Sequence, residues 1–326
     1  MKNRFAILKI GAVAAVCATF AANGGAAAGS AQIWLGGVDP IVLASMEPNG
    51  TSDFMDLFAP QAPWSRAASQ VKVFQASTQF FSKAPDQMLT RMFEDLKRRH
   101  IALSLSALIL SGDGQCGEGV EGYSAPRQML AIANRIKKLG GTLSYVAMDG
   151  PFMGGHFYSG PRACHSSVEA IAKDVAEKVK QMRAVFPDLQ VGDIEPVGVT
   201  EPAGWANSLI EWTRAYKVAV GEPLAFVHCD MQWRGPWQAQ LHMLETQLRA
   251  DGTRIGVIYN GFAADKTDEE WVQHAENHFN TLERDEPLVP DDAVIQTWNR
   301  HPSRFLPETQ PGTLTYLVNR YGSGHR

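Results

Sequence analysis

Residues 143–149 read LSYVAMD, residues 189–195 read LQVGDIE and residues 224–230 read LAFVHCD. Each segment is a mainly apolar run that ends in a carboxylate, and the stretches between them, residues 167–186 and 205–220, have apolar residues at helical spacing. Strands of nearly continuous apolar character are typical of a parallel sheet that is covered by helices. The three segments therefore predict a repeated strand–helix unit of the α/β class.

The same alternation extends over the rest of the chain. Eight strand-like segments without an interrupting domain favour closure into a single (β/α)8 TIM barrel. A dinucleotide-binding sheet is less favoured, because the Gly36-Gly37 pair after the first strand lacks the third glycine of that motif. The further strands are predicted at residues 33–38, 71–76, 101–109, 254–260 and 293–298, and the further helices at 85–99, 126–139, 237–250 and 268–282, with weaker helical patterns at 51–59 and 313–321.

The start of the chain predicts an export signal. Three basic residues among the first nine precede an apolar run of about 13 residues, and small residues follow at 26–31. The apolar run is shorter than the roughly 20 residues that a membrane-spanning helix needs. We therefore expect residues 1–31 to be removed, leaving a barrel domain over residues 32–326 that has no membrane span and is periplasmic or secreted. A lipoprotein signal at Cys17 is less favoured, because Val16 stands where a small residue is expected.

The charge of the chain disfavours a nucleic-acid partner. Lys and Arg number 30 against 34 Asp and Glu, a formal net charge of −4. The predicted signal contains three bases and no acid, so the remaining chain carries about −7. Such a chain has no basic field with which to bind phosphate backbones or anionic membranes. Its apolar content of 45% is enough for a large core, whereas composition makes no prediction of the oligomeric state.

Three cysteines lie beyond the predicted signal. Cys116 and Cys164 fall in glycine-rich loops, whereas Cys229 lies within an apolar strand. In an oxidising compartment we expect Cys116 and Cys164 to form a disulfide and Cys229 to be a buried thiol; the alternative is three free thiols. No CxxC or HxH spacing occurs, so no metal site and no cofactor are predicted.

Three successive predicted strands end in acids, namely Asp149, Glu195 and Asp230. Residues at the carboxyl ends of barrel strands surround a common mouth, so we expect the three carboxyl groups to converge there. Two opposed carboxyl groups can cleave a glycosidic bond, one as proton donor and the other as nucleophile or base. We predict Glu195 and Asp230 as the catalytic pair and Asp149 as a third carboxylate, with Glu118 and Glu121 as candidate acids of lower rank. Any one of these acids could instead cap a helix or pair with an arginine.

Aromatic and polar side chains near the same strand ends predict a sugar-binding rim. Sugar rings have apolar faces and polar edges, which suit flat side chains beside amide and carboxylate groups. A histidine at such a position can orient a substrate hydroxyl or carboxylate, although a lone strand histidine is more often a core residue. The predicted substrate-binding residues are Asp193, His228, Gln232, Trp233, Tyr158, Tyr259, Asn260, Gln296 and Trp298.

The strand-end pattern resembles the (β/α)8 glycoside hydrolase superfamily. The triplet at 194–196, Ile-Glu-Pro, is similar to the acid/base triplet of its largest clan displaced by one strand, and Asp149 with Asp230 is similar to the pair of α-galactosidase-like enzymes. The resemblance implies an enzyme that hydrolyses or transfers a glycosidic bond of an oligosaccharide or polysaccharide. The chain departs from the largest clan at Gly150, which stands where that clan has its glutamate.

Two other functions stay open from the sequence. A non-catalytic carbohydrate-binding barrel would use the same acids to bind hydroxyl groups, and it is favoured by Gly150 and by a seventh strand that ends at Asn260 rather than at a carboxylate. A metal-dependent hydrolase would need His156 and His165 as ligands together with an acid, an arrangement that no spacing requires.

Overall fold

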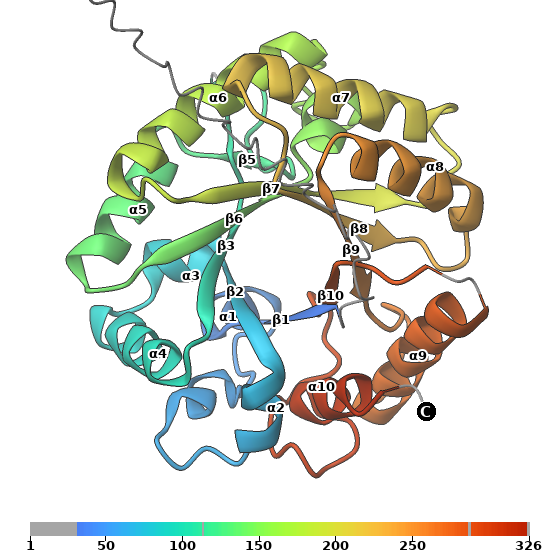
Figure 1. Cartoon of the computed structure of the whole chain (residues 1–326). Helices are drawn as coiled ribbons and strands as arrows, with labels where there is room; N and C mark the ends of the chain where they lie inside the picture. Colours follow the sequence, from blue (N-terminus) through green and yellow to red (C-terminus); the bar gives the residue numbers. More distant parts are fainter. Residues whose placement is uncertain (1–30, 113, 286–287, 325–326) are drawn as a thin grey trace, which may run out of the picture. The chain divides into compact units, whose positions relative to one another are not determined.

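Eight parallel strands form a closed barrel surrounded by helices (Figure 1). The computed structural model describes residues 31–112, 114–285 and 288–324, and residues 1–30 of the predicted export signal lie outside these ranges. The closed order of the strands confirms the predicted single (β/α)8 TIM barrel. In their order around the barrel, the strands are β1 (Gln32–Gly36), β10 (Asp292–Ile295), β9 (Arg254–Tyr259), β8 (Phe226–Met231), β7 (Gln190–Val197), β6 (Leu143–Asp149), β3 (Ala102–Ala107) and β2 (Val71–Ser77).

The long helices cover the outside of the barrel (Figure 1). Their ends follow local sequence signals: Ser167 caps the start of one of them by accepting a hydrogen bond from the Ala170 backbone, and Gly221 ends another in a left-handed conformation. These signals explain why the predicted bounds lie close to the observed ones. The helices are α4 (Asp86–Arg99), α5 (Gln128–Lys138), α6 (Val168–Val185), α7 (Trp205–Val220), α8 (Trp237–Ala250), α9 (Asp268–Asn280) and α10 (Leu314–Gly322).

Several short elements were not predicted from the sequence. Each has fewer than about two helical turns or only two residues in a strand, so no apolar periodicity can develop. The predicted helix at 51–59 is shorter and consists of the 3-10 helix η1 (Phe54–Phe58). The additional elements are α1 (Pro40–Met46), α2 (Ser65–Gln70), α3 (Thr78–Lys83), the π-helices η2 (Met153–Phe157) and η3 (Thr281–Asp285), and the strand pair β4 (Leu110–Ser111) and β5 (Tyr123–Ser124).

Side chains from strands that are not neighbours meet inside the barrel. The Trp34 ring of β1 lies 4.9 Å from the Tyr145 ring of β6 and 5.0 Å from the Phe226 ring of β8, measured between centroids. Because side chains alternate along a strand, these contacts identify the residues that face inward. Asp149 shares its face of β6 with Tyr145, and Asp230 shares its face of β8 with Phe226, so both carboxyl groups point into the barrel.

Strand β7 presents its acids to the opposite side. A Cβ atom at Gly192 would lie 2.3 Å from the Phe226 ring, so this glycine faces inward and makes room for that ring. Ile194, two residues on, packs in the same interior cluster as Phe226. Asp193 and Glu195 therefore belong to the outward face, beneath the helices.

The amino end of the barrel is closed by a buried polar group. His228 Nε2 lies 3.2 Å from Asp292 Oδ2, and Arg254 Nε lies 3.3 Å from the same oxygen. His228 and Asp292 are both completely buried. The barrel interior therefore holds a neutralised acid beside its aromatic side chains.

One long excursion leaves the barrel after β3 and returns at α5. The disulfide between Cys116 and Cys164 ties this loop to the segment before α6, as predicted, and Cys229 is a buried free thiol. The backbone N–H of Gly117 also donates to the Arg162 carbonyl, and the Arg162 side chain forms an ion pair with Glu118. The loop is thus fixed to the body of the barrel at one place by three interactions. No described helix combines the length and apolar character that crossing a bilayer requires.

Candidate active site

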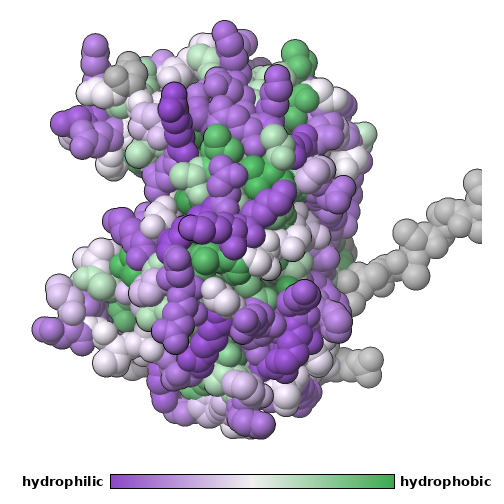
Figure 2. Space-filling model, turned by 90° about the vertical axis from the view of Figure 1, so that its left-hand side faces the viewer, coloured by the Kyte–Doolittle hydropathy of each residue, from purple (hydrophilic) through white to green (hydrophobic). Residues whose placement is uncertain are grey.

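A cavity of about 550 Å³ opens at the carboxyl ends of the strands. The barrel axis, seen end-on in Figure 1, lies across Figure 2, where the outline of the molecule is deeply notched at its left edge. This end of a (β/α)8 barrel is the usual place for an active site. The polar and aromatic residues that line the cavity are Asp39, Gln75, Ser77, Gln79, Ser106, Glu121, Asp149, Glu195, Asp230, Gln232, Gln296, Thr297 and Trp298.

Asp149 is the last residue of β6 and faces this central cavity. The Ser106 hydroxyl donates to its Oδ2 atom over 3.1 Å. Burial raises the pKa of Asp149 to about 6, and the nearby charge of Glu121 adds to the increase. At neutral pH this carboxyl group is therefore mainly ionised but holds a proton more readily than an exposed aspartate.

Asp230 reaches the same cavity from β8, two strands away. Its Oδ1 atom is buried without a hydrogen-bond partner among the described residues. Burial raises the pKa of Asp230 to about 7, and the charges of Asp149 and Glu121 contribute, whereas a hydrogen bond with Asn260 opposes them. Asp230 is thus close to half-protonated at neutral pH, which suits a proton donor.

Glu195 lies in the wall of the cavity, but its carboxyl group is occupied by the backbone. Its Oε1 atom accepts a hydrogen bond from the Phe152 N–H (2.7 Å) and its Oε2 atom one from the Met153 N–H (3.2 Å). The side chain is completely buried, and burial raises its pKa well above the ordinary value, with the charge of Asp193 adding to this. Glu195 therefore holds the turn that follows Asp149, and its place in the catalytic pair stays a prediction.

Glu121, which the sequence predicts only as a lower-ranked candidate acid, lines the central cavity. It stands on the disulfide-linked loop, and its charge raises the pKa of Asp149, of Asp230 and of Glu195. Its own pKa is raised because the cavity walls exclude part of the solvent, although the side chain is open to the cavity mouth.

Glycines bring the backbone of Glu121 close to the barrel. A Cβ at Gly154 would lie 2.1 Å from the Glu121 carbonyl oxygen, and one at Gly122 would lie 3.0 Å from the Gly150 carbonyl oxygen. Gly122 also has a φ of +85°, which other residues rarely adopt. The glycines that surround Glu121 and follow Asp149 were the sequence signal that these two segments pack together.

Three predicted substrate-binding residues lie away from the cavity and are corrected. Asp193 faces outward and accepts a hydrogen bond from Trp212 Nε1 (2.6 Å). Tyr259 also faces outward, is completely buried and donates to Glu283 Oε1 (2.6 Å). His228 lies deeper in the barrel, against Asp292. Residue alternation cannot reveal which face of a strand points inward, and this explains the errors on β7 and β9.

The remaining predicted rim residues are divided between two places. Gln232, Gln296 and Trp298 line the central cavity, and the Trp298 side chain is 42% exposed. Trp233 and Asn260 line a neighbouring cavity of about 610 Å³, where the indole N–H of Trp233 donates to Asn260 Oδ1. This neighbouring cavity shares Asp230, Gln232 and Trp298 with the central one. Tyr158 is exposed and lines neither of them.

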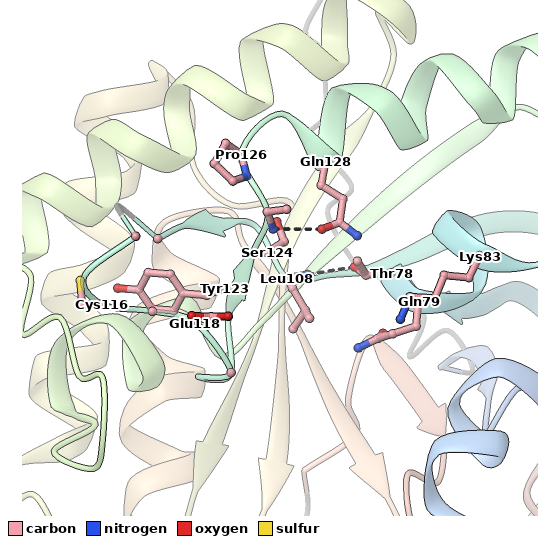
Figure 3. A pocket seen from close by; sticks show the side chains of 15 residues that line it. Thr78, Gln79, Lys83, Leu108, Cys116, Glu118, Tyr123, Ser124, Pro126 and Gln128 are labelled. Atoms are coloured by element: carbon pink, nitrogen blue, oxygen red, sulfur yellow. Dashed lines mark hydrogen bonds between the residues drawn. The ribbon is translucent and has the colours of Figure 1, made fainter. Parts of the chain in front are cut away.

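A third cavity has a volume of about 500 Å³, and Figure 3 shows the side chains that line it. The disulfide-linked loop supplies Glu118 and Tyr123 to it, and α3 supplies Gln79 and Lys83. Gln79 lines both this cavity and the central one. The central cavity therefore adjoins each of the other two.

Potential metal ligands gather at a different place. Among the described residues, only Asp265, Glu270 and His274 bring three ligand atoms within 4.8 Å of one another. Asp265 Oδ1 lies 2.9 Å from His274 Nδ1, and its Oδ2 atom accepts a hydrogen bond from the Phe262 N–H. These contacts explain why the three side chains lie together: Asp265 holds the loop before α9 in place. The histidines considered for a metal-dependent hydrolase, His156 and His165, do not form such a group with an acid.

No protein-family model matches the chain, and no curated protein matches it. Solved xylanases do match its structure. One is a mutant of xylanase A of P. fluorescens subsp. cellulosa in complex with xylopentaose, with 12% identity, a TM-score of 0.51, and coverage of 90% of this chain and 98% of that one. Another is a Thermobacillus composti GH10 xylanase, with 12% identity, a TM-score of 0.51, and coverage of 90% of this chain and 97% of that one. A third is a thermostable mutant of a Cellvibrio japonicus xylanase, with 13% identity, a TM-score of 0.50, and coverage of 91% of this chain and 99% of that one. The chain shares their barrel fold. At such low identity the similarity shows the fold alone.

Proposed function

We propose that the chain hydrolyses or transfers a glycosidic bond in the central cavity, with Asp149 and Asp230 as the reacting carboxyl groups. The observation that carries the proposal is that these two acids face inward from strands on either side of β7 and have raised pKa values without a cationic partner. Acids that only stabilise a fold are usually neutralised by a partner. The glycoside hydrolase-like barrel supports the same reading by analogy.

The two carboxyl groups suit complementary roles. Asp230, with a pKa of about 7, donates a proton to the oxygen of the leaving sugar as the C–O bond breaks. Asp149, with a pKa of about 6, is the carboxylate that either attacks the anomeric carbon or removes a proton from the attacking water. Glu195 contributes by holding the turn after Asp149 in place. Retention of the anomeric configuration in the product would identify Asp149 as the nucleophile, and inversion would identify it as the base.

The adjoining cavities support an oligosaccharide or polysaccharide substrate. Each of the three has the volume of a typical small-ligand site, and the central one lies between the other two. Trp298 offers an exposed ring where the central cavity meets the cavity of Trp233, which suits the apolar face of a sugar. A chain of several sugars would therefore extend to both sides of Asp149 and Asp230.

The proposal includes export to the periplasm or the medium. The Cys116–Cys164 disulfide supports it, because such bonds persist in oxidising compartments. The basic and apolar start of the chain supports it independently.

Release of reducing ends from a panel of oligosaccharides tests the proposal. Asp149→Asn and Asp230→Asn should each lower kcat by at least about 100-fold, the range expected for loss of an acid or base. Asp188→Asn is the matched control, because Asp188 is an exposed acid in the turn before β7, at the amino end of the barrel. Full activity in both cavity variants would refute the catalytic assignment. Binding of oligosaccharides without turnover by the native protein would instead favour the carbohydrate-binding barrel.

A further inference from the structure

The charges around the central cavity are all of one sign. Five acids line it, and no Lys, Arg or His is among the described residues that do so. Cationic lining residues occur in the adjoining cavities, with Lys83 in one and Arg234 in the other. A neutral or anionic sugar in the central cavity would leave these acids uncompensated.

Two of the five acids are already committed to the fold. Asp39 caps α1 by accepting hydrogen bonds from the Ile41 and Val42 backbone, and it also accepts one from the Ser77 hydroxyl. Glu195 is held by the backbone after β6. These two acids have partners for their oxygens and are not the ones available to a ligand.

The other three acids have unused acceptor capacity that faces the cavity. Glu121 has no hydrogen bond or ion pair among the described residues, and Asp149 has only the Ser106 hydroxyl. Asp230 keeps one buried oxygen without a partner. A buried acceptor of this kind is costly unless a bound group satisfies it.

The spacing of these three acids favours an organic cation over a metal ion. Their oxygens do not form a group within 4.8 Å, although another group of described residues does. A single divalent ion shared by all three acids would hold its oxygen ligands at roughly 2.0–2.6 Å and bring most pairs of them within this distance, whereas an ammonium group can be bound by two of the acids alone. An ammonium group on a sugar ring donates three hydrogen bonds in different directions and is carried on a body that fills the space between the acids.

We propose that the sugar bound in the central cavity carries a free, protonated amino group, so that the substrate is an amino-sugar glycan that is not N-acetylated. The inference rests on the proposed function for the place of cleavage. Glu121 and the free oxygen of Asp230 accept hydrogen bonds from the ammonium group. Acetylation would remove its charge and most of its donors, and a uronic acid would add a further negative charge to the cavity.

The test compares hexasaccharides that differ only at nitrogen. Purified protein is incubated with glucosamine and galactosamine hexamers in several linkages, with their fully N-acetylated counterparts, and with neutral xylose and glucose hexamers. We expect kcat/KM for one free-amine hexamer to exceed that of its N-acetylated counterpart at least tenfold. We also expect KM for this substrate to fall as the pH rises through the pKa of Glu121, which burial raises above its ordinary value, because the ammonium group binds the ionised carboxylate.

A variant of Glu121 separates this interaction from general damage. Glu121→Gln should raise KM for the free-amine hexamer at least tenfold more than it changes KM for the N-acetylated or neutral hexamers. Glu211→Gln, an exposed acid on α7, is the control and should change neither value.

Each outcome decides a different claim. Preferential cleavage of N-acetylated or neutral hexamers would overturn the amino-sugar inference and leave the glycosidase proposal standing. If no glycan is cleaved, the glycosidase proposal fails, and calorimetric binding of the same hexamers then decides the inference: tighter binding of the free amines supports it, and equal or weaker binding overturns it.

Discussion

Two aspartates inside the same barrel have opposite surroundings at its two ends. At the amino end, burial alone would raise the pKa of Asp292, but the hydrogen bond from His228 and the charge of Arg254 bring it below the ordinary value. Since burial lowers the pKa of His228, we take the guanidinium as the charge and the imidazole as a neutral donor. At the carboxyl end, Asp230 has no cation, and its pKa rises to about 7. Asp292, which is paired with a cation, thus stabilises the fold, whereas Asp230, which is not, is available for chemistry.

The largest expected difference comes from replacing the aspartate at each end of the barrel with asparagine. Asp292→Asn should lower the free energy of unfolding by about 1–3 kcal/mol, because it weakens the buried acceptor of His228 and removes the charge that pairs with the partly exposed Arg254. Asp230→Asn should raise it at pH 8, because it removes an uncompensated buried charge. Urea unfolding of both variants measures the difference. The comparison fails if both substitutions change stability in the same direction by the same amount.

Removing the disulfide tests how the loop at the carboxyl end of the barrel is held in place. The double change of Cys116 and Cys164 to serine should cost about 2–4 kcal/mol, since the bond closes a long loop. It should also lower kcat, because the same loop carries Glu121 to the cavity. Thermal unfolding and activity are measured on the variant and on Cys229→Ser, whose thiol has no part in the loop. A stability loss with kcat unchanged would show that Glu121 is placed without help from the bond.

The dependence of stability on pH should reflect the carboxyl end. Asp149, Asp193, Glu195 and Asp230 have raised pKa values in the folded protein, so the folded state binds more protons than the unfolded state between about pH 4 and 7. Their contribution to stability is therefore complete at about pH 4 and is lost as the pH rises through 6 to 7. We expect Tm to fall by several degrees over this interval, and less in Asp230→Asn. An increase of Tm with pH would contradict the raised pKa values.

The smallest expected effect concerns Trp298 at the rim. Its ring is partly exposed between two cavities, so Trp298→Ala should raise KM by roughly threefold to tenfold, about 1 kcal/mol, with little change in kcat or Tm. Phe305→Ala, which truncates a buried ring of the core, should lower Tm instead. Steady-state kinetics on a cleaved oligosaccharide distinguishes the two. An unchanged KM in Trp298→Ala would remove this ring from the binding surface.

The sequence predicted the barrel well because its strands are long apolar runs and its outer helices have caps and apolar faces. Segment 205–220 is an example, since Gly204 and Gly221 bound it and its apolar residues pack on the barrel. The short helix α1 was missed, because seven residues carry too little periodicity. Its start does have a local signal, because Asp39 caps the helix directly before Pro40 at the first helical position.

The site was predicted only in part. Asp149 and Asp230 were placed at the mouth from their positions at strand ends, and both line the cavity. Glu195 also lines the cavity, whereas Asp193 does not, because the inward face of β7 is decided by the Phe226 ring of β8 packed against Gly192. Glu121 reaches the site through a loop whose path depends on a disulfide and on glycine contacts distant in sequence.

The burial of Cys229 has a consequence for how the protein matures. Its thiol lies inside β8, so once the strands have assembled an oxidant meets only two of the three cysteines in the described residues. Assembly of the strands before oxidation leaves a single pairing, and no shuffling enzyme is needed to correct it. The Cys116–Cys164 bond then completes the attachment of the loop that brings Glu121 to the cavity.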